Sequence, residues 1–340
     1  MSYTSAVDAK TERIEQALRA VLPAGTAVVA EPTNTDMVYL EIGETSVGAQ
    51  TAWIGEGWLS DVRRAIMRLP NGLDFVTAHR LSPGARAAAT EAGLGWIDES
   101  GAAELSLPGV IVSRSGSPEP KRDPSFHWTR SMVGTAEALL VGARPTVAGV
   151  AQTTGLSAGA ATNALASLTA LGLLQTAAAR GRNSARQIVD RTRLLNEYAN
   201  AAVAIPKGPS LRVGIVGDLI SELSLMGKRW DSDAIPWAAT GDAAGSVMAP
   251  YLSQVTTVDV FIDVKTLASL VALAQRFRLH PTDSGRLLLR PFPTSATQRL
   301  ASKVGDLHVA PWPRVYADLR VSGVRGEEAA EHLREVTAGV

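Results

Sequence analysis

Apolar residues recur at helical spacing through the middle of the chain. In the segment 129–142, Met132 and Leu139 fall on one side of a helix with 3.6 residues per turn. A shorter apolar segment at 147–151 predicts a second helix. In the segment 157–171 one face of a third helix is apolar, and its residues are Ala161, Ala164, Leu165, Leu168 and Leu171. The pattern therefore predicts three helices in succession.

The residues between these segments are typical of helix ends. Pro145 suits the start of a helix, because the backbone N–H that it lacks would be unpaired there. Gly155 can adopt a positive φ without a Cβ clash, which suits a turn. Ser157 is a good N-cap, since its hydroxyl can accept a hydrogen bond from a backbone N–H of the first turn.

Two short strands with a basic tip follow the third helix. The strands are expected at 173–177 and 186–189, and the tip at 178–184 reads Ala-Ala-Arg-Gly-Arg-Asn-Ser. Three helices and such a hairpin predict a winged helix-turn-helix, which reads DNA. From residue 129 to 189 there are five arginines and one acid, Glu137, whereas the whole chain has 33 residues of each sign. Because phosphate contacts dominate DNA affinity, this local excess of +4 favours DNA binding.

The third helix is the expected recognition helix. Small side chains on its polar face let it lie close to the floor of the major groove, and Thr162 or Asn163 can bond base edges or phosphates. The expected DNA-contacting residues are Thr146, Ser157, Ala158, Gly159, Thr162, Asn163, Arg180, Arg182, Asn183 and Arg186. The alternative for this segment is a dimerisation or docking module, since winged helices also serve protein contacts.

The flanking regions alternate between strand and helix patterns, which predicts an α/β multi-domain protein. The N-terminal region reads as helix, three strands, helix, strand, helix and further strands, with a mixed sheet. The C-terminal region alternates again from residue 211 onward. The expected organisation is an α/β domain, a proline-rich linker, the winged domain with an exit helix, and a C-terminal α/β domain, at 1–115, 116–128, 129–204 and 205–340.

The N-terminal domain resembles the restriction-endonuclease-like fold, in the form attached to bacterial AbiE-type antitoxins. The residues that carry the resemblance are Asp36-Met37-Val38, Phe75-Val76-Thr77-Ala78, Leu81-Ser82-Pro83-Gly84-Ala85-Arg86 and Gly93-Leu94-Gly95-Trp96-Ile97-Asp98. Active members hold a divalent metal with one acid and an acid-x-lysine on the next strand. Asp36 stands where the first acid would be, but 48–52 (Gly-Ala-Gln-Thr-Ala) has neither acid nor lysine. We therefore expect a degenerate, inactive metal site, with Asp36 as a turn residue at a strand edge.

The C-terminal domain resembles the C-terminal domain of AbiE-type antitoxins, which is distantly like a nucleotidyltransferase. The resemblance is carried by 239–244 (Ala-Thr-Gly-Asp-Ala-Ala), 258–263 (Val-Asp-Val-Phe-Ile-Asp) and the segments at 316–319 and 326–330. Asp242, Asp259 and Asp263 could cluster around a metal. We favour the alternative, in which Asp242 caps a helix and Asp263 ends a strand, because the paired acids of nucleotidyl transfer are missing.

The composition also limits the cell compartment and the kinds of metal site that we expect. The chain has no cysteine, which excludes disulfides and thiolate metal sites and fits a reducing compartment. No apolar run approaches the roughly 20 residues that span a bilayer, and residues 1–15 do not read as a signal peptide. The five histidines show no metal-ligand spacing. We expect a cytoplasmic protein without catalytic residues, metal or cofactor.

The sequence thus predicts a sequence-specific DNA-binding transcription regulator that is not an enzyme. A single winged domain offers one reading helix, so we expect a homodimer on a palindromic operator. The resemblance to AbiE-type antitoxins implies repression of its own operon and a nucleotidyltransferase-like toxin as partner. Two alternatives stay open: an enzyme acting on nucleic acid that the winged domain targets, and an antitoxin that acts mainly through protein contact.

Overall fold

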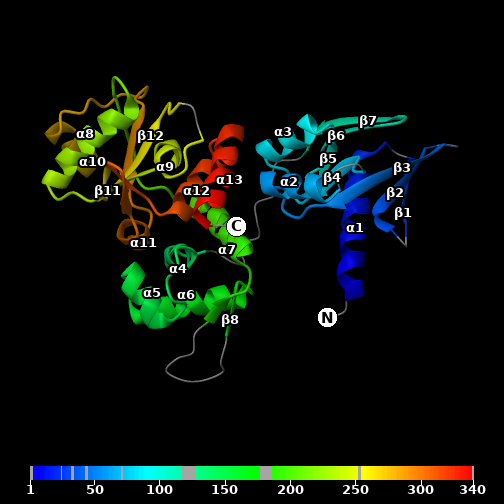
Figure 1. Cartoon of the computed structure of the whole chain (residues 1–340), viewed down its shortest axis with the longest axis horizontal. Coiled ribbons are helices and arrows are strands. Elements are labelled where there is room, and N and C mark those ends of the chain that lie inside the picture. Colours follow the sequence, from blue (N-terminus) through cyan, green and yellow to red (C-terminus); the bar gives the residue numbers. More distant parts are fainter. Residues whose placement is uncertain are drawn as a thin grey trace. The chain divides into compact units, whose positions relative to one another are not determined.

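The protein is an α/β chain with two mixed sheets and a separate two-stranded sheet (Figure 1). The computed structural model describes residues 3–23, 25–31, 34–42, 45–69, 72–116, 128–176, 186–251 and 254–338. The chain divides into two compact units, Met1–Pro124 and Ser125–Val340. No described helix is both long and apolar enough to cross a lipid bilayer.

The first unit is built on a seven-stranded sheet whose strand order follows the sequence. The central pairs, β3 with β4 and β4 with β5, are parallel, and the outer pairs are antiparallel. The strands are β1 (Ala27–Glu31), β2 (Asn34–Ile42), β3 (Thr45–Trp53), β4 (Phe75–Ala78), β5 (Gly95–Asp98), β6 (Ala102–Leu107) and β7 (Val110–Ser115).

Helices cover both faces of this sheet. The helix α1 (Tyr3–Val21) buries Ile14 and Leu18 in one apolar cluster with the sheet. The helices α2 (Leu59–Arg68) and α3 (Pro83–Glu91) belong to a second cluster. Asp36, expected at a turn, instead lies inside β2, because that strand begins at Asn34.

The second unit contains a six-stranded mixed sheet in the order β10-β13-β12-β11-β15-β14. The pairs β12–β13 and β11–β15 are parallel, and the other pairs are antiparallel. The strands are β10 (Leu211–Val213), β11 (Trp237–Thr240), β12 (Val258–Ile262), β13 (Leu287–Pro291), β14 (Ser302–Val304) and β15 (Leu307–Val309).

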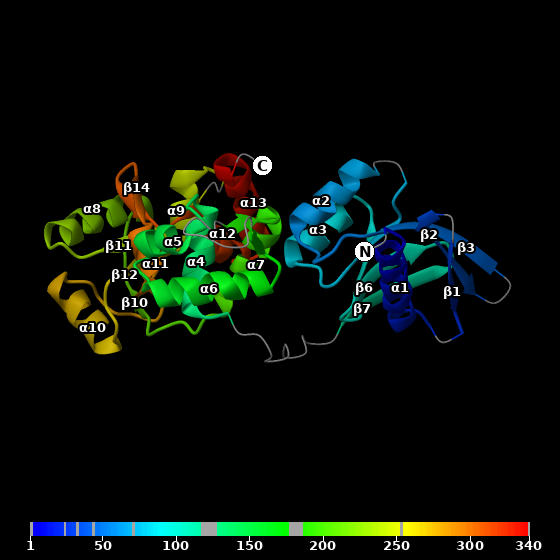
Figure 2. The same ribbon diagram turned by 90° about the horizontal axis from the view of Figure 1, so that it is seen from below.

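This sheet is the middle layer of a three-layer arrangement. Figures 1 and 2 show α8 and α10 on one face and α9 and α12 on the other, with α13 packed on α12. The helices are α8 (Leu219–Ser232), α9 (Gly241–Met248), α10 (Leu267–Arg276), α11 (Ser295–Arg299), α12 (Trp312–Arg320) and α13 (Val324–Ala338). The expected cap at Asp242 is wrong: Thr240 is the N-cap residue of α9, and Asp242 lies in its first turn.

The same unit carries a helical module that precedes the sheet in the chain. Its elements are α4 (Arg130–Leu140), α5 (Val147–Thr154), α6 (Ala158–Ala170), β8 (Leu174–Thr176), β9 (Arg186–Ile188) and α7 (Arg191–Ala204). The two strands pair antiparallel. One continuous hydrophobic cluster includes residues of the module, such as Leu165 and Tyr198, and residues of the sheet layer, such as Phe261. The module and the sheet therefore share a core.

Candidate nucleic-acid interface

The pair α5 and α6 is fixed by caps and a tight turn. The Thr146 hydroxyl accepts a hydrogen bond from the backbone N–H of Gly149 at 3.1 Å, so Thr146 is the N-cap of α5. Gly155 ends α5 with φ of +73°, in the left-handed region that favours glycine. The Ser157 hydroxyl accepts from Ala160 N–H at 3.2 Å and begins α6. The turn that the sequence predicts at Gly155 and the N-cap that it predicts at Ser157 are both confirmed.

Helix α6 has one buried and one exposed face. Its buried residues are Ala161, Ala164, Leu165 and Leu168. Ser157, Ala158, Gly159, Thr162 and Asn163 are all exposed, so the structure brings these candidate residues together on the outer side. In Figure 2, which views the molecule from below, α6 lies in front and no described helix or strand covers it.

The exposed face of α6 is small and polar. A Cβ added at Gly159 would meet nothing within 4 Å, so another molecule can approach the backbone closely here. The Thr162 hydroxyl donates to the carbonyl of Ala158 at 2.8 Å, which leaves its oxygen lone pairs as acceptors. The amide of Asn163 can donate and accept at once, as base-edge recognition requires.

Arg186 has a structural role that the sequence does not show. Its Nε donates to the Thr169 hydroxyl at 3.2 Å, and its backbone N–H donates to the carbonyl of Pro145 at 3.1 Å. The side chain is half-buried, so it joins the base of the hairpin to α6. The candidates Arg180, Arg182 and Asn183 lie outside the described residues.

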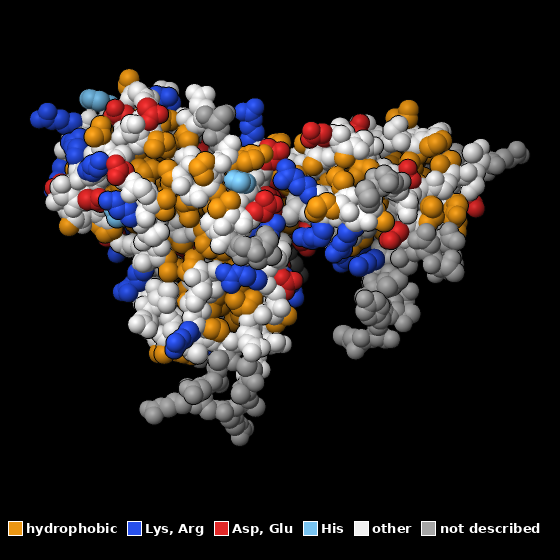
Figure 3. Space-filling view, in the orientation of Figure 1, with side chains coloured by type: hydrophobic (Ala, Val, Ile, Leu, Met, Phe, Trp, Pro, Cys, Tyr) orange, Lys and Arg blue, Asp and Glu red, His pale blue; other side chains and the backbone are white. Residues whose placement is uncertain are grey.

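Further exposed arginines lie on or beside the helical module. Arg130 begins α4 and Arg144 precedes α5. Arg299 lies in the last turn of α11, and its Nε would be 2.5 Å from a Cβ added at Gly155, so it lies against the turn before α6. Sequence reasoning missed Arg299, because only the folded chain brings it to the helical module. On the face shown in Figure 3, the surface of the module is mostly uncharged, with separate basic side chains.

A buried polar cluster holds the helical module on the sheet layer. The Oε2 atom of Glu137 in α4 accepts from the hydroxyls of Tyr198 in α7 and Thr297 in α11, both at 3.0 Å. Burial raises the pKa of the Glu137 carboxyl to about 7, against the lowering effect of Arg314. The Ser295 hydroxyl also donates to the carbonyl of Thr154 at 2.9 Å. Helix α11 is thus hydrogen-bonded to both α4 and the end of α5.

The acids of the second unit do not form a metal site among the described residues. Asp259 Oδ2 lies 2.6 Å from Nη2 of Arg290 and is neutralised by it. Asp263 is exposed beyond the end of β12. Burial, and secondarily the charge of Asp259, raise the pKa of Asp242. These three carboxylates therefore give no support to metal-assisted catalysis.

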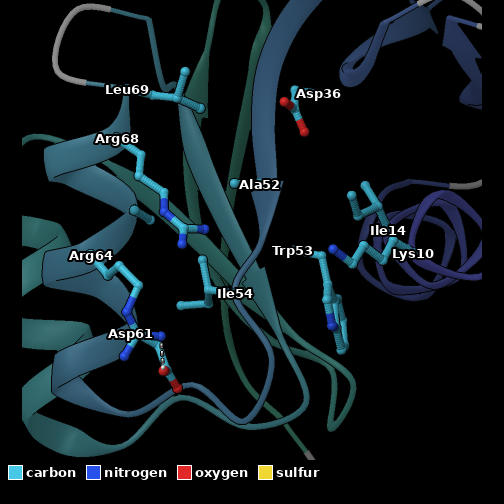
Figure 4. Close-up of a pocket in the computed structure, with 11 residues that line it drawn as sticks. Lys10, Ile14, Asp36, Ala52, Trp53, Ile54, Asp61, Arg64, Arg68 and Leu69 are labelled. Carbon is cyan, nitrogen blue, oxygen red and sulfur yellow. Dashed lines mark hydrogen bonds and ion pairs between the residues drawn. The ribbon is translucent and has the colours of Figure 1, made fainter. Parts of the chain in front are cut away.

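In the first unit, Asp36 lines a cavity of about 500 Å³ (Figure 4). Figure 4 shows Arg64 and Arg68 of α2 across Ala52 from Asp36. The second acid of the wall, Asp61, is engaged: its Oδ1 lies 3.4 Å from Arg64 Nη1, and its Oδ2 accepts from a backbone N–H. No acid-x-lysine pair on β3 accompanies Asp36, so this cavity gives no support to metal-dependent cleavage.

Comparison with known proteins leaves the family open. No protein-family model, no curated protein and no solved structure matches this chain. The resemblance to AbiE-type antitoxins therefore stays a prediction.

Proposed function

We propose that residues 129–189 form a winged helix-turn-helix and that the protein is a DNA-binding transcription regulator. One observation carries the proposal: α6 buries its apolar face in the module and leaves a small, polar face open from Ser157 to Asn163. A helix that enters the major groove needs this division, because its outer side must approach base edges closely.

In this proposal the N-terminal half of α6 lies in the major groove. Asn163 reads a base edge, and Gly159 lets the backbone approach the groove floor. Arg144 and Arg299 neutralise phosphates on either side, and the arginines expected in the hairpin tip, Arg180 and Arg182, contact the backbone or the minor groove. Phosphate contacts of this kind position the helix, while base contacts give specificity.

The biological setting belongs to the same proposal. We infer a homodimer on a palindromic operator, since one module reads only half a site. The resemblance to AbiE-type antitoxins supports repression of the protein's own operon in a bacterial cytoplasm. It also names a candidate partner, a nucleotidyltransferase-like toxin.

The test is selection of bound fragments from sheared genomic DNA, followed by fluorescence anisotropy on the selected duplex. Asn163→Ala should weaken specific binding about tenfold, since one good base contact contributes about 1–3 kcal/mol of discrimination. Arg276→Ala, which removes an exposed arginine of α10, serves as the matched surface control and should leave binding unchanged. Failure to select any fragment at low salt, or equal binding by Asn163→Ala, would contradict the proposal.

A further inference from the structure

A second cavity, in the second unit, lies between the helical module and the sheet layer. It is bounded by the end of α7, the loop 205–209, β12 and β13. Its volume is about 340 Å³, and small-ligand sites occupy about 300–1,000 Å³. Arg130, at the start of α4, and Arg314 of α12 also line it. The cavity thus collects side chains from both parts of the unit.

Among the described residues that line this cavity there are cations but no carboxylate. The cations are Arg130, Lys207, Lys265, Arg290 and Arg314. Acids outside the lining neutralise the last two: Arg290 Nη2 is 2.6 Å from Asp259, and Arg314 Nη2 is 2.7 Å from Asp318. The other three are exposed and form no ion pair with a described residue. Their positive charge is available to a ligand.

The inner wall is aromatic and holds the two buried guanidinium groups in place. The Cζ atoms of Arg290 and Arg314 lie 5.1 and 5.3 Å from the centroid of the Phe261 ring. The Phe292 ring lies 5.8 Å from Phe261, centroid to centroid. Stacking of this kind fixes the plane of a guanidinium group. The cavity therefore offers a preformed apolar surface beside its cationic groups.

Arg290 is the most constrained of these cations. It is only 8% exposed, and its Nε atom is buried without a hydrogen-bond partner. A buried donor left unpaired costs about 1–3 kcal/mol, so such a group calls for an explanation. The ion pair of its Nη2 atom with Asp259 and its contact with the Phe261 ring hold the guanidinium in the wall of the cavity and offset this cost.

We propose that this cavity binds a small phosphate monoester with a flat, apolar organic group. A phosphate dianion has the charge and the acceptor oxygens to engage Arg130, Lys207 and Lys265 together. A carboxylate would compensate only one of these three charges. The organic group would pack against the half-buried Phe292 ring. The site stands independently of DNA binding.

Its consequence for regulation rests on the proposed function. Arg130 begins α4 and Lys207 follows the end of α7, while Lys265 follows the end of β12. An anion that bridges them ties both ends of the helical module to the sheet layer. Binding of the phosphate ester would then change the affinity for DNA. Such coupling requires only that the ester favour one arrangement of the helical module, and that this arrangement bind DNA with a different affinity.

Isothermal titration calorimetry with phenyl phosphate tests the site without DNA. We expect one binding site per chain, with affinity about tenfold weaker in Lys207→Ala and in Lys265→Ala. Lys303→Ala, which removes an exposed lysine of the edge strand β14, should leave the affinity unchanged. Because these lysines are exposed and contribute nothing to the core, their alanine variants should fold. Wild-type affinity in both Lys207→Ala and Lys265→Ala would overturn the site. So would the absence of saturable binding at millimolar phenyl phosphate.

Two further arms separate the parts of the proposal. Inorganic phosphate should bind more weakly than phenyl phosphate, and equal affinity would refute the apolar subsite. Phenyl phosphate should change the dissociation constant for the selected duplex, and an unchanged constant would refute the effector role. If the protein binds no DNA, the proposed function is refuted. Calorimetry then still shows whether the cavity binds phenyl phosphate.

Discussion

Glu137 is a buried carboxyl group where α4, α7 and α11 meet. Burial raises its pKa from 4.5 to about 7, so between these pH values the folded state holds a proton that the unfolded state releases. The contribution of Glu137 to the free energy of unfolding should therefore fall as pH rises through this window, by about 3 kcal/mol at most. Glu137→Gln removes the titrating group, so its stability relative to the wild type should increase from pH 4.5 to pH 8.

Urea denaturation across this pH range measures the effect. The two proteins share every other titrating group, so the difference between their unfolding free energies isolates Glu137. Curves that stay parallel from pH 4.5 to pH 8 would show that the carboxyl titrates normally in the folded protein.

Gly155 and Gly159 form a matched pair of glycines around the start of α6. Gly155→Ala places a Cβ at φ of +73°, which should destabilise the protein by about 1–2 kcal/mol. Gly159→Ala falls within the helix and in open space, so it should stabilise by about 0.5–1 kcal/mol. Thermal unfolding of both variants checks the signs. Stabilisation by Gly155→Ala would contradict the conformation of the turn.

At the level of secondary-structure elements, strong periodicity and end signals were enough to predict most helices and strands. The exposed face of α6 follows from its apolar spacing alone, since burying Ala161 and Leu165 turns Thr162 and Asn163 outward. The short helix α11 escaped prediction because its five residues carry no periodic apolar run. The edge strand β14 escaped because Ser302 and Lys303 are exposed and break the alternation.

Parts of the candidate sites also needed the folded chain. Asp242 looks like a helix cap in sequence, but Thr240 occupies that position and donates its hydroxyl to Asp318 at 2.7 Å instead of capping. The contact of Arg299 with the turn at Gly155 joins segments that are distant in sequence. The cationic cavity likewise draws on five separate stretches, those around Arg130, Lys207, Lys265, Arg290 and Arg314. No local pattern encodes such contacts.

The N-cap of α6 allows stability and DNA binding to be separated. Ser157→Ala removes the hydroxyl that accepts from Ala160, which should cost about 1 kcal/mol of stability. Ser157→Asp restores a good cap but adds a negative charge at the proposed interface. We expect unfolding free energies near the wild type for Ser157→Asp, together with weaker DNA binding. If Ser157→Asp bound DNA with wild-type affinity, the start of α6 would not be part of the DNA interface.

At the level of the whole molecule, the net charge is zero, with 33 basic and 33 acidic residues. Any salt dependence of DNA binding must therefore come from local contacts rather than from the overall charge. The slope of log affinity against log salt should be about −0.9 per phosphate contact. Arg144→Ala and Arg299→Ala should each reduce its magnitude by about 1. Slopes equal to the wild type, measured by anisotropy, would remove these residues from the interface.

Amide hydrogen exchange with and without the selected duplex tests the central claim most directly. Exchange reports protection along the whole chain, so it locates the DNA without assuming where it binds. We predict new protection at the start of α6, in residues 157–163, and at the start of α5. Protection confined to the first unit, or to β12 and β13 with α6 unchanged, would contradict the assignment of α6 as the DNA-reading helix.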